Sequence, residues 1–263
     1  MPRKVMKVKV LLERKIFLIE NLLTKEECER LTVLMTSENT ETIGVSGQSH
    51  RVCERSVVEM PDLGASLWAR VSKVMEEHKV MKVVKKEQHL FSGQWDAIGL
   101  NERFRLVRYK KGGHFAPHCD SYYERSVSER SFWTLNIYLN TVPAEYGGVT
   151  SFLLPGHPCL DVQPRAGSAC LFFQPNTLHC GAELTGGSKY LLRTDVMFRR
   201  REGSHQELTE EQEEALVLYR RAEEQELGQE QDKAWRLYAR AFKLWPHLET
   251  QQFREPDFMP GSM

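Results

Sequence analysis

The chain has 263 residues, of which 41% are hydrophobic and 10% aromatic, which is enough to fill a core and excludes a wholly disordered protein. Its 36 lysine and arginine residues balance 36 aspartate and glutamate residues, and this neutrality disfavours nucleic acid as a partner. No stretch of about 20 apolar residues and no signal-peptide pattern occurs, so we expect a cytoplasmic or nuclear protein with no membrane partner.

Six cysteines are spread over the chain without a CxxC pair. A zinc site built on paired cysteines is therefore not expected. Because no secretory signal is present, a disulfide framework is not expected either.

The first hundred residues predict strands followed by two helices. Residues 5–19 alternate and are rich in Val, Ile, Leu and Phe, which predicts one or two strands. The segment Thr24–Glu27 has the spacing of a capping box, so a helix should begin there. Apolar residues at helical spacing predict a second helix from about Asp62 to His78. We interpret residues 40–50 as a loop, and residues 80–103 show no clear pattern.

From residue 104 onward, short β-rich runs alternate with turns that contain glycine or proline. The runs cover residues 104–109, 132–140, 150–154, 160–162, 168–173 and 189–198. Many short strands with frequent turns are typical of a β-sandwich or a jelly-roll barrel. The sequence therefore predicts a mainly β fold, with helices before the β-rich region and after it.

The last sixty residues return to a helical pattern. The segment Thr209–Gln212 is another capping box, and a second helix should follow Gly228. The pattern A-W-x-x-Y-x-x-A-x-x-L-x-P from Ala234 to Pro246 resembles a single tetratricopeptide-type repeat, which does not usually bury its own apolar face. We therefore predict two domains, residues 1–203 and residues 204–263, the second being a helical hairpin with a loose tail. The hairpin should pack on the β domain or on a protein partner.

One short segment carries a candidate metal site. His118 and Asp120 form an H-x-D pattern, and in an extended segment residues i and i+2 point to the same side. His179 follows 59 residues after Asp120. Two histidines and one carboxylate form the facial triad of non-haem iron(II) oxygenases, which leaves coordination positions for a bidentate 2-oxo acid and for O2. The H-x-D pattern alone is weak, and the alternative for His118 is an ordinary turn histidine.

The residues around this segment resemble the catalytic domain of the prolyl 4-hydroxylase-type Fe(II)/2-oxoglutarate-dependent dioxygenases. Order and spacing agree from residue 104 to residue 198, and the upstream segment FLIENLLTKEECERL extends the resemblance to roughly residues 15–200. The matching positions are Arg108, Tyr109, Gly112, Gly113, His118, Asp120, Tyr138, Leu139, Asn140, Gly147, Gly148, Thr150, Phe152, Pro164, Gly167, Phe172, Leu178, His179, Gly187 and Lys189. The resemblance implies a double-stranded β-helix (jelly-roll) core. It also implies iron(II) as the metal, 2-oxoglutarate and O2 as co-substrates, and ascorbate as an accessory cofactor.

The resemblance further implies a cation for the distal carboxylate of 2-oxoglutarate, because an unpaired buried charge is costly. Lys189 stands ten residues after His179, where this family has its basic residue. Arg193 lies on the same face of the strand and is the second candidate. Arg193 is a departure from the collagen-type enzymes, and it could instead pair with Asp195 or meet the substrate.

Two tyrosines and two arginines are further candidates. Tyr138 matches a family tyrosine whose hydroxyl can bond the distal carboxylate, and Tyr109 matches one that lines the pocket; for both, the alternative is packing in the strand core. Arg125 and Arg130 lie in the loop before the β-rich run at residues 132–140, where related enzymes receive substrate. The alternative for this pair is a charged, solvated loop.

Three neighbours of the triad are not expected to bind the metal. Cys119 and Cys180 each adjoin a ligand, and strand neighbours point to opposite faces, so we interpret both as small buried side chains. His114 has the wrong spacing to Asp120 for a ligand pair.

The pattern as a whole predicts an oxygenase that hydroxylates a C–H bond. By resemblance, the favoured substrate is a peptidyl proline, so a peptide or protein is the expected substrate partner. The alternatives within this class are a small molecule or a nucleobase. A different class remains open, namely a non-catalytic binding or scaffold protein on the same fold that docks partners through the C-terminal hairpin.

Overall fold

The computed structural model describes residues 4–37, 40–44, 49–85, 92–204, 208–227, 230–246, 248 and 259–260. The chain divides into two compact units, one with residues 1–83, 95–200 and 260–263 and the other with residues 84–94 and 201–259. No helix in the described part of the chain has the length and apolar character needed to cross a membrane. The predicted domain boundary at residue 203 stays a prediction.

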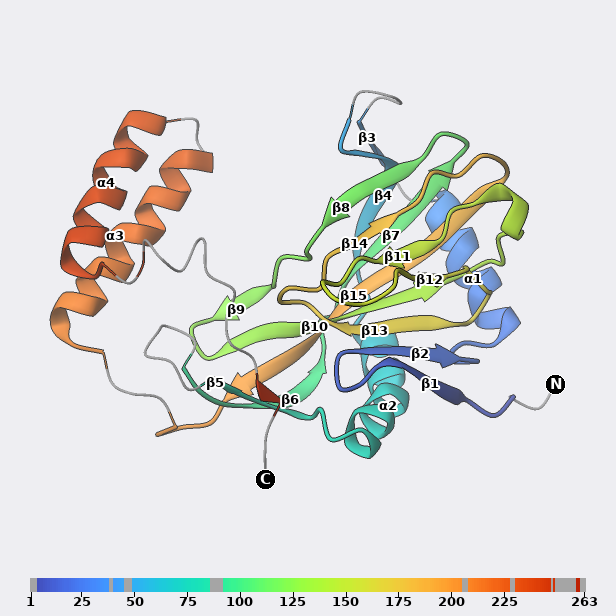
Figure 1. Cartoon of the computed structure of the whole chain (residues 1–263), viewed down its shortest axis with the longest axis horizontal. Helices are drawn as coiled ribbons and strands as arrows, with labels where there is room; N and C mark the ends of the chain where they lie inside the picture. Colours follow the sequence, from blue (N-terminus) through green and yellow to red (C-terminus); the bar gives the residue numbers. More distant parts are fainter. Residues whose placement is uncertain are drawn as a thin grey trace. The chain divides into compact units, whose positions relative to one another are not determined.

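The first unit contains two antiparallel β-sheets that share strand β4 (Figure 1). In spatial order, the larger sheet contains β1 (Lys7–Leu12), β2 (Ile16–Glu20), β13 (Ala169–Phe173), β10 (Glu129–Tyr138), β15 (Ser188–Arg200), β7 (Arg103–Lys110) and β4 (Arg51–Glu59). The smaller sheet contains β8 (His114–His118), β14 (His179–Gly181), β11 (Thr150–Phe152) and β12 (Leu160–Val162). The remaining elements are β3 (Glu41–Ile43), β5 (Lys82–Lys85), β6 (Gly93–Leu100), β9 (Glu124–Ser126), β16 (Met259–Pro260) and the 3-10 turn η1 (Ala144–Tyr146). The predicted jelly-roll core is confirmed.

Strand β4 connects the two sheets because it changes partner along its length. Residues 54–59 of β4 pair with β7 in the larger sheet, whereas Arg51 and Val52 pair with Phe115 and His114 of β8 in the smaller sheet. The turn between β7 and β8 therefore folds the chain from one sheet into the other. This fold brings β7, β8 and β4 to the same side of the core.

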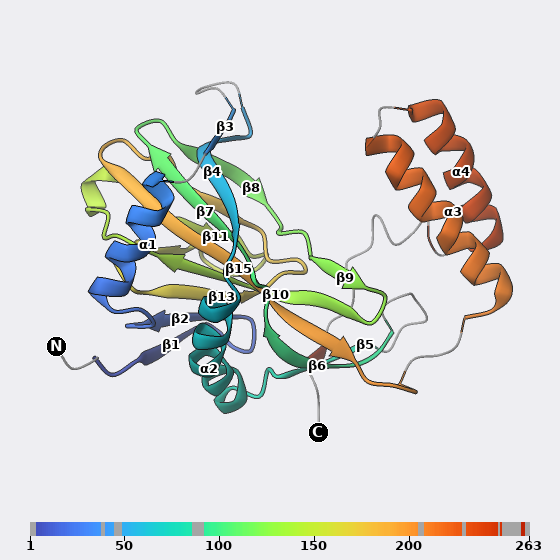
Figure 2. The same ribbon diagram turned by 180° about the vertical axis from the view of Figure 1, so that it is seen from behind.

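Helices α1 (Lys25–Ser37) and α2 (Pro61–Glu77) lie against the outer face of the larger sheet, as Figure 2 shows. The predicted capping box of α1 is confirmed, because the Glu27 amide donates to Thr24 Oγ1 and the Thr24 amide donates to a Glu27 carboxylate oxygen. The buried stripe of α2 contains Leu67, Val71, Val74 and Met75. Strand β10 is buried from residue 130 to residue 138 because layers cover both of its faces.

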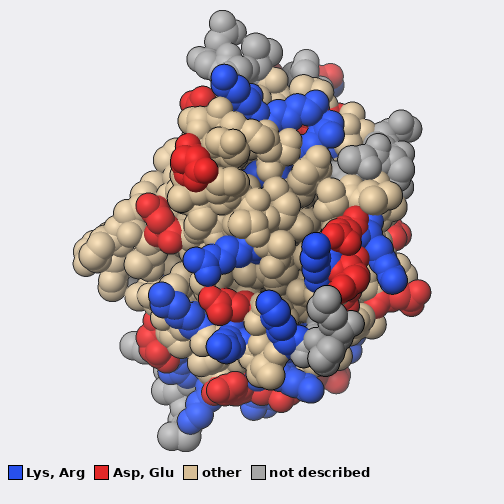
Figure 3. Space-filling view, turned by 90° about the vertical axis from the view of Figure 1, so that its right-hand side faces the viewer, with Lys and Arg blue, Asp and Glu red and all other residues tan. Residues whose placement is uncertain are grey.

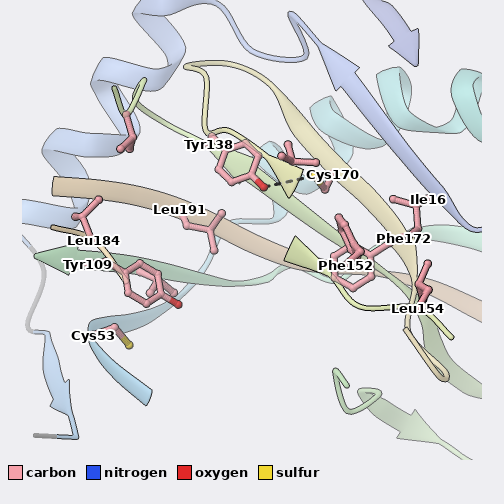
Figure 4. Packing of buried hydrophobic residues seen from close by; sticks show 13 residues of the cluster. Ile16, Cys53, Tyr109, Tyr138, Phe152, Leu154, Cys170, Phe172, Leu184 and Leu191 are labelled. Carbon is pink, nitrogen blue, oxygen red and sulfur yellow. Dashed lines mark hydrogen bonds between the residues drawn. The ribbon is translucent and has the colours of Figure 1, made fainter. Parts of the chain in front are cut away.

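A core of apolar and aromatic side chains fills the space between the two sheets (Figure 4). Phe152 from the smaller sheet packs edge to face on Phe172 from the larger sheet, with ring centroids 5.2 Å apart. Tyr109, Tyr138 and Leu191 extend the same cluster. This packing fixes the distance between the sheets at the level where the polar side chains described below converge.

The second unit contains the predicted helix pair, α3 (Glu210–Leu227) and α4 (Gln231–Leu244). Its capping box is confirmed by the bonds between Thr209 and Gln212. Apolar side chains of both helices form a small core of their own, with Ala215, Leu218, Ala241 and Trp245 buried. Trp235, in contrast, is 71% exposed. The likeness to a tetratricopeptide repeat stays a prediction.

Two segments differ from the prediction. Residues 40–50 were expected to form a loop, but Glu41–Ile43 form β3, which pairs with residues 53–55 of β4. Residues 80–103, which carry no clear pattern, contain β5 and β6. Strand β3 is only three residues long, and β6 pairs with the distant strand β15, so neither gives a clear local apolar alternation.

Candidate metal centre

Two adjacent strands bring the predicted ligands together. His118 ends β8 and His179 begins β14, and these residues are direct partners in the antiparallel register. Asp120 follows β8 by two residues and turns back toward them, with 3.6 Å between His118 Nε2 and Asp120 Oδ1 and 3.8 Å between His179 Nε2 and Asp120 Oδ2. The donor atoms of all three lie within 4.8 Å of one another. The expected convergence is therefore confirmed.

The backbone sets the tautomer of both histidines. His118 Nδ1 lies 2.9 Å from the Ala116 carbonyl oxygen, and His179 Nδ1 lies 2.9 Å from the Thr177 carbonyl oxygen. A carbonyl only accepts, so Nδ1 must carry the proton in both rings and Nε2 keeps its lone pair. Burial lowers the pKa of His179, which also favours the neutral ring. Both Nε2 atoms are consequently ready to bind a metal ion.

Asp120 is held as a buried carboxylate by two donors. Thr134 Oγ1 donates to Asp120 Oδ2 over 2.9 Å, and Arg193 lies 3.0 Å from Asp120 Oδ1. Burial would raise the pKa of Asp120, but the Arg193 guanidinium and the hydrogen bond donated by Thr134 outweigh it, so this pKa lies well below its usual range. The residue is therefore ionised at neutral pH.

The two donors to Asp120 belong to a closed ring of interactions behind the site. Gln174 Nε2 lies 3.2 Å from Thr134 Oγ1 and 2.9 Å from Asp195 Oδ1. Asp195 in turn pairs with Arg193 at 3.4 Å, and its side chain is fully buried. The ring fixes the orientation of Asp120 from both of its oxygens, which is the support that a ligating carboxylate requires.

The three residues fit an iron(II) ion. Two neutral imidazole nitrogens and one carboxylate are the donor set of the facial triad, and their free atoms face a common point. Cys119 and Cys180 do not contribute a donor to this cluster. Cys180 is partly buried, but the prediction that Cys119 is buried was wrong: its side chain is exposed, because it points outward just beyond the end of β8.

A cavity opens over the triad and contains several cations. Its polar lining, apart from the triad, includes Arg51, Arg105, Tyr109, Asn136, Thr150, Lys189 and Arg193. Lys189 is only 4% exposed, and Nζ donates to the Gly148 carbonyl oxygen over 2.8 Å. Burial lowers the pKa of Lys189 to about 8. Within the described residues, no carboxylate lies at ion-pair distance from this ammonium group.

The sequence of the β-rich core matches a known family. Residues 104–194 fit the family model of the 2OG-Fe(II) oxygenase superfamily. This region of the chain belongs to the 2OG-Fe(II) oxygenase superfamily. Its triad is intact, which is the feature that distinguishes an active member of such a family from a fold that has lost its metal.

Solved structures share the fold of this oxygenase at low identity. A prolyl-4-hydroxylase from Pseudomonas putida is 16% identical, with 71% of this chain and 93% of that chain covered at a TM-score of 0.51. The alpha-ketoglutarate-dependent carbocyclase SnoK from nogalamycin biosynthesis is 15% identical, with 73% and 83% covered at a TM-score of 0.50. No curated protein sequence matches the chain significantly.

The two tyrosines of the oxygenase take different places. Tyr109 lines the cavity, and burial raises the pKa of its hydroxyl to about 12. Tyr138 lies beside Cys170 in the core (Figure 4), and its hydroxyl donates to Thr150 Oγ1 over 2.8 Å. Tyr138 is therefore connected to the cavity by its hydrogen bond to Thr150, which belongs to the lining.

The arginines predicted as candidates also lie in different environments. Arg193 lines the cavity, but it already pairs with Asp120 and Asp195. Arg125 pairs with Glu102 and Glu129 at the surface. Arg130 is 1% exposed and stacks 3.8 Å from the Tyr122 ring. Neither Arg125 nor Arg130 is part of the cavity lining, so their contact with substrate stays a prediction.

Sequence reasoning missed Arg51, Arg105, Asn136 and Thr150. Alternation would have found two of them, since Arg105 shares a strand face with Tyr109, and Asn136 shares one with Tyr138. Thr150 belongs to the matched family pattern. Arg51 gives no local signal, because it joins the cavity only through the pairing of β4 with β8.

Proposed function

We propose that this oxygenase hydroxylates a C–H bond of a peptidyl prolyl residue and that Lys189 holds the distal carboxylate of 2-oxoglutarate. The observation that carries the proposal is the cavity itself. It places an intact His-Asp-His triad and a buried lysine without a carboxylate partner, within the described residues, in one enclosure. A dicarboxylate that chelates the metal at one end would supply the missing charge at the other.

The three ligands would hold iron(II) through His118 Nε2, His179 Nε2 and a carboxylate oxygen of Asp120. Iron, when bound with 2-oxoglutarate and O2, supplies the oxidation that inserts one oxygen atom into a C–H bond and releases succinate and CO2. Thr134 and Arg193 keep Asp120 ionised and oriented. Lys189 orients the co-substrate, with Tyr109 on the cavity wall and Thr150 held by Tyr138.

Lys189 is preferred over Arg193 for the distal carboxylate because of their existing partners. Arg193 contacts two carboxylates, and a third would have to compete with them. Lys189 donates to the Gly148 carbonyl and lies 5.5 Å from the centroid of Tyr109. An incoming carboxylate would relieve the cost of burying this ammonium group.

The prolyl substrate rests on the family resemblance, with the Pseudomonas putida prolyl-4-hydroxylase as a neighbour of similar fold. The carbocyclase SnoK shows that a similar fold also serves small-molecule chemistry. Hydroxylation of a small molecule is therefore the second candidate. Ascorbate is proposed as the reductant that keeps the iron active.

The test is succinate formation by the purified protein with iron(II), 2-oxoglutarate and ascorbate, in the presence and absence of a library of proline-containing peptides. We expect peptide-stimulated succinate and the gain of one oxygen atom on proline. Turnover without any stimulation by peptide would reject the prolyl substrate. Absence of iron binding would favour the scaffold alternative.

Replacement of one ligand provides the sharpest variant. Asp120→Ala removes the only anionic ligand, so we expect loss of iron binding and a fall in succinate formation of at least about 1,000-fold. Asp232→Ala, which removes an exposed carboxylate from α4, is the matched control and should behave as wild type. Wild-type turnover by Asp120→Ala would contradict the metal assignment.

A further inference from the structure

The cavity over the triad concentrates positive charge in a chain whose net charge is zero. Among the described residues, four cations line it, namely Arg51, Arg105, Lys189 and Arg193, whereas Asp120 is the only carboxylate in the lining. On the molecular face shown in Figure 3, basic and acidic side chains are instead interspersed. The excess is therefore a property of the cavity that this face of the molecule does not share.

The excess of positive charge persists after iron(II) and 2-oxoglutarate, the occupants in the proposed function, are counted. Asp195, which lies behind the lining, pairs with Arg105 at 3.1 Å and with Arg193 at 3.4 Å. Four cations then face two carboxylates, an excess of two positive charges among the described residues. Iron(II) and the two carboxylates of 2-oxoglutarate cancel each other in charge. A neutral substrate would leave the excess unbalanced in a partly enclosed space.

Arg51 is placed to receive a substrate anion. Its guanidinium lies 4.4 Å over the Phe115 ring, and its Nε donates to Cys53 Sγ over 3.1 Å. These contacts hold the side chain without neutralising it. Within the residues that the structure describes, no carboxylate lies at ion-pair distance from Arg51.

Arg105 offers a second, partly satisfied cation. It lies directly opposite Arg193 in the register of β7 and β15, an arrangement of like charges that is unfavourable without an anion nearby. Asp195 supplies one carboxylate for both. The Arg105 side chain stays 26% exposed, so part of its guanidinium remains accessible from the cavity.

We propose that the substrate of this oxygenase carries a carboxylate close to the carbon that is oxidised, and that Arg51 and Arg105 recognise it. This inference rests on the proposed function and narrows its substrate to an acidic one. Two sources of such a carboxylate fit, an acidic side chain beside proline in a peptide and the carboxylate of a free acid. Arginine suits both, because its planar guanidinium can bind a carboxylate through two parallel hydrogen bonds.

Binding without turnover tests the inference. The protein is loaded with iron(II) and 2-oxoglutarate under nitrogen, and titration calorimetry measures two matched pairs of probes. The first pair is a terminally blocked peptide with glutamate on both sides of proline and the same peptide with glutamine. The second pair is N-acetylproline and N-acetylprolinamide. We expect the anionic member of at least one pair to bind about tenfold more tightly, and the pair identifies the source of the carboxylate.

Single substitutions then assign the preference. Arg51→Gln should remove most of the preference for the anion and leave the Kd of the neutral probe within about twofold, since only the charged contact is lost. Arg105→Gln should act in the same direction, and Arg51→Lys should restore part of the preference. Lys111→Gln removes the same charge from the exposed turn between β7 and β8 and is the matched control. The Kd for 2-oxoglutarate should not change in Arg51→Gln.

Three results would overturn the inference. Equal binding of charged and neutral probes in both pairs is the first, and a preference that survives Arg51→Gln and Arg105→Gln is the second. A weakened Kd for 2-oxoglutarate in Arg51→Gln, with substrate binding intact, is the third, because it would assign Arg51 to the co-substrate. A charge preference without hydroxylation of any proline probe would instead reject the prolyl substrate and support the acidic one.

Discussion

In the proposed function, Lys189 couples the affinity for 2-oxoglutarate to pH. Its ammonium group is buried, and this burial lowers its pKa to about 8 in the protein without ligand. A carboxylate bound beside it would stabilise the charged form and raise that pKa. The ligand thus prefers the protonated protein, so affinity is complete below pH 8 and declines as the pH rises above it.

The Kd of 2-oxoglutarate, measured with manganese(II) in place of iron to prevent turnover, should therefore rise by up to about tenfold per pH unit above about pH 8. Lys189→Arg keeps its charge throughout this range, because the guanidinium pKa exceeds about 12. This variant should show no such rise. A Kd of the wild type that is flat between about pH 7 and about pH 9.5 would show that Lys189 does not pair with the co-substrate.

At the scale of elements, helix α1 is tied to the rest of the fold at its first turn. Thr24 and Glu27 cap each other's backbone amides, and Glu27 also receives Arg70 from α2 at 2.7 Å. Gly167, before β13, approaches so closely that an added Cβ would lie 2.3 Å from the Leu23 carbonyl oxygen. These contacts thus fix the position of the first turn of α1 against the larger sheet.

Thr24→Ala should destabilise the protein by about 1 kcal/mol, because the helix loses the oxygen that accepts its Glu27 amide. The midpoint of urea unfolding measures this loss. Thr32→Ala, in the middle of the same helix, is the control and should have a smaller effect, since its hydroxyl only bonds the Cys28 carbonyl that the helix already uses. Equal destabilisation by the two variants would contradict the role of the cap.

The elements also show where reading the sequence succeeds. Strands β7, β10, β13 and β15 alternate or are continuously apolar, so the local pattern locates them, and the H-x-D segment locates the triad. Strand β3 is three residues long and mostly exposed, so it gives no periodic signal. The cationic lining depends on the register of β4 against β8, a contact between distant segments that local patterns do not contain. Likewise, the exposure of Cys119 follows from its place beyond a strand end.

At the scale of the whole molecule, every residue that lines the cavity belongs to the first compact unit. The helix pair of the second unit has its own apolar core. Recognition of a protein partner by this pair stays a prediction, for which the exposed Trp235 is the first side chain to replace.

A chain that ends at residue 203 should therefore retain iron binding and form succinate from 2-oxoglutarate at a rate within about threefold of the full chain, since autonomous domains keep their own cores. Circular dichroism before the assay establishes that the shortened protein is folded. A folded but inactive protein would show that the helix pair takes part in catalysis.

The carbonyl groups that fix both imidazole rings have a consequence for the cell that makes this protein. Because the backbone carbonyls leave the Nε2 atom of both rings free for a metal, we expect the site to bind other divalent ions of similar size as well. Affinity at such nitrogen and oxygen donors increases from iron(II) through cobalt and nickel to copper. Nickel or cobalt in excess would thus bind the site of the folded protein and leave the enzyme inactive. The fraction of active enzyme would then depend on the relative concentrations of these metal ions in the cell rather than on the amount of protein made.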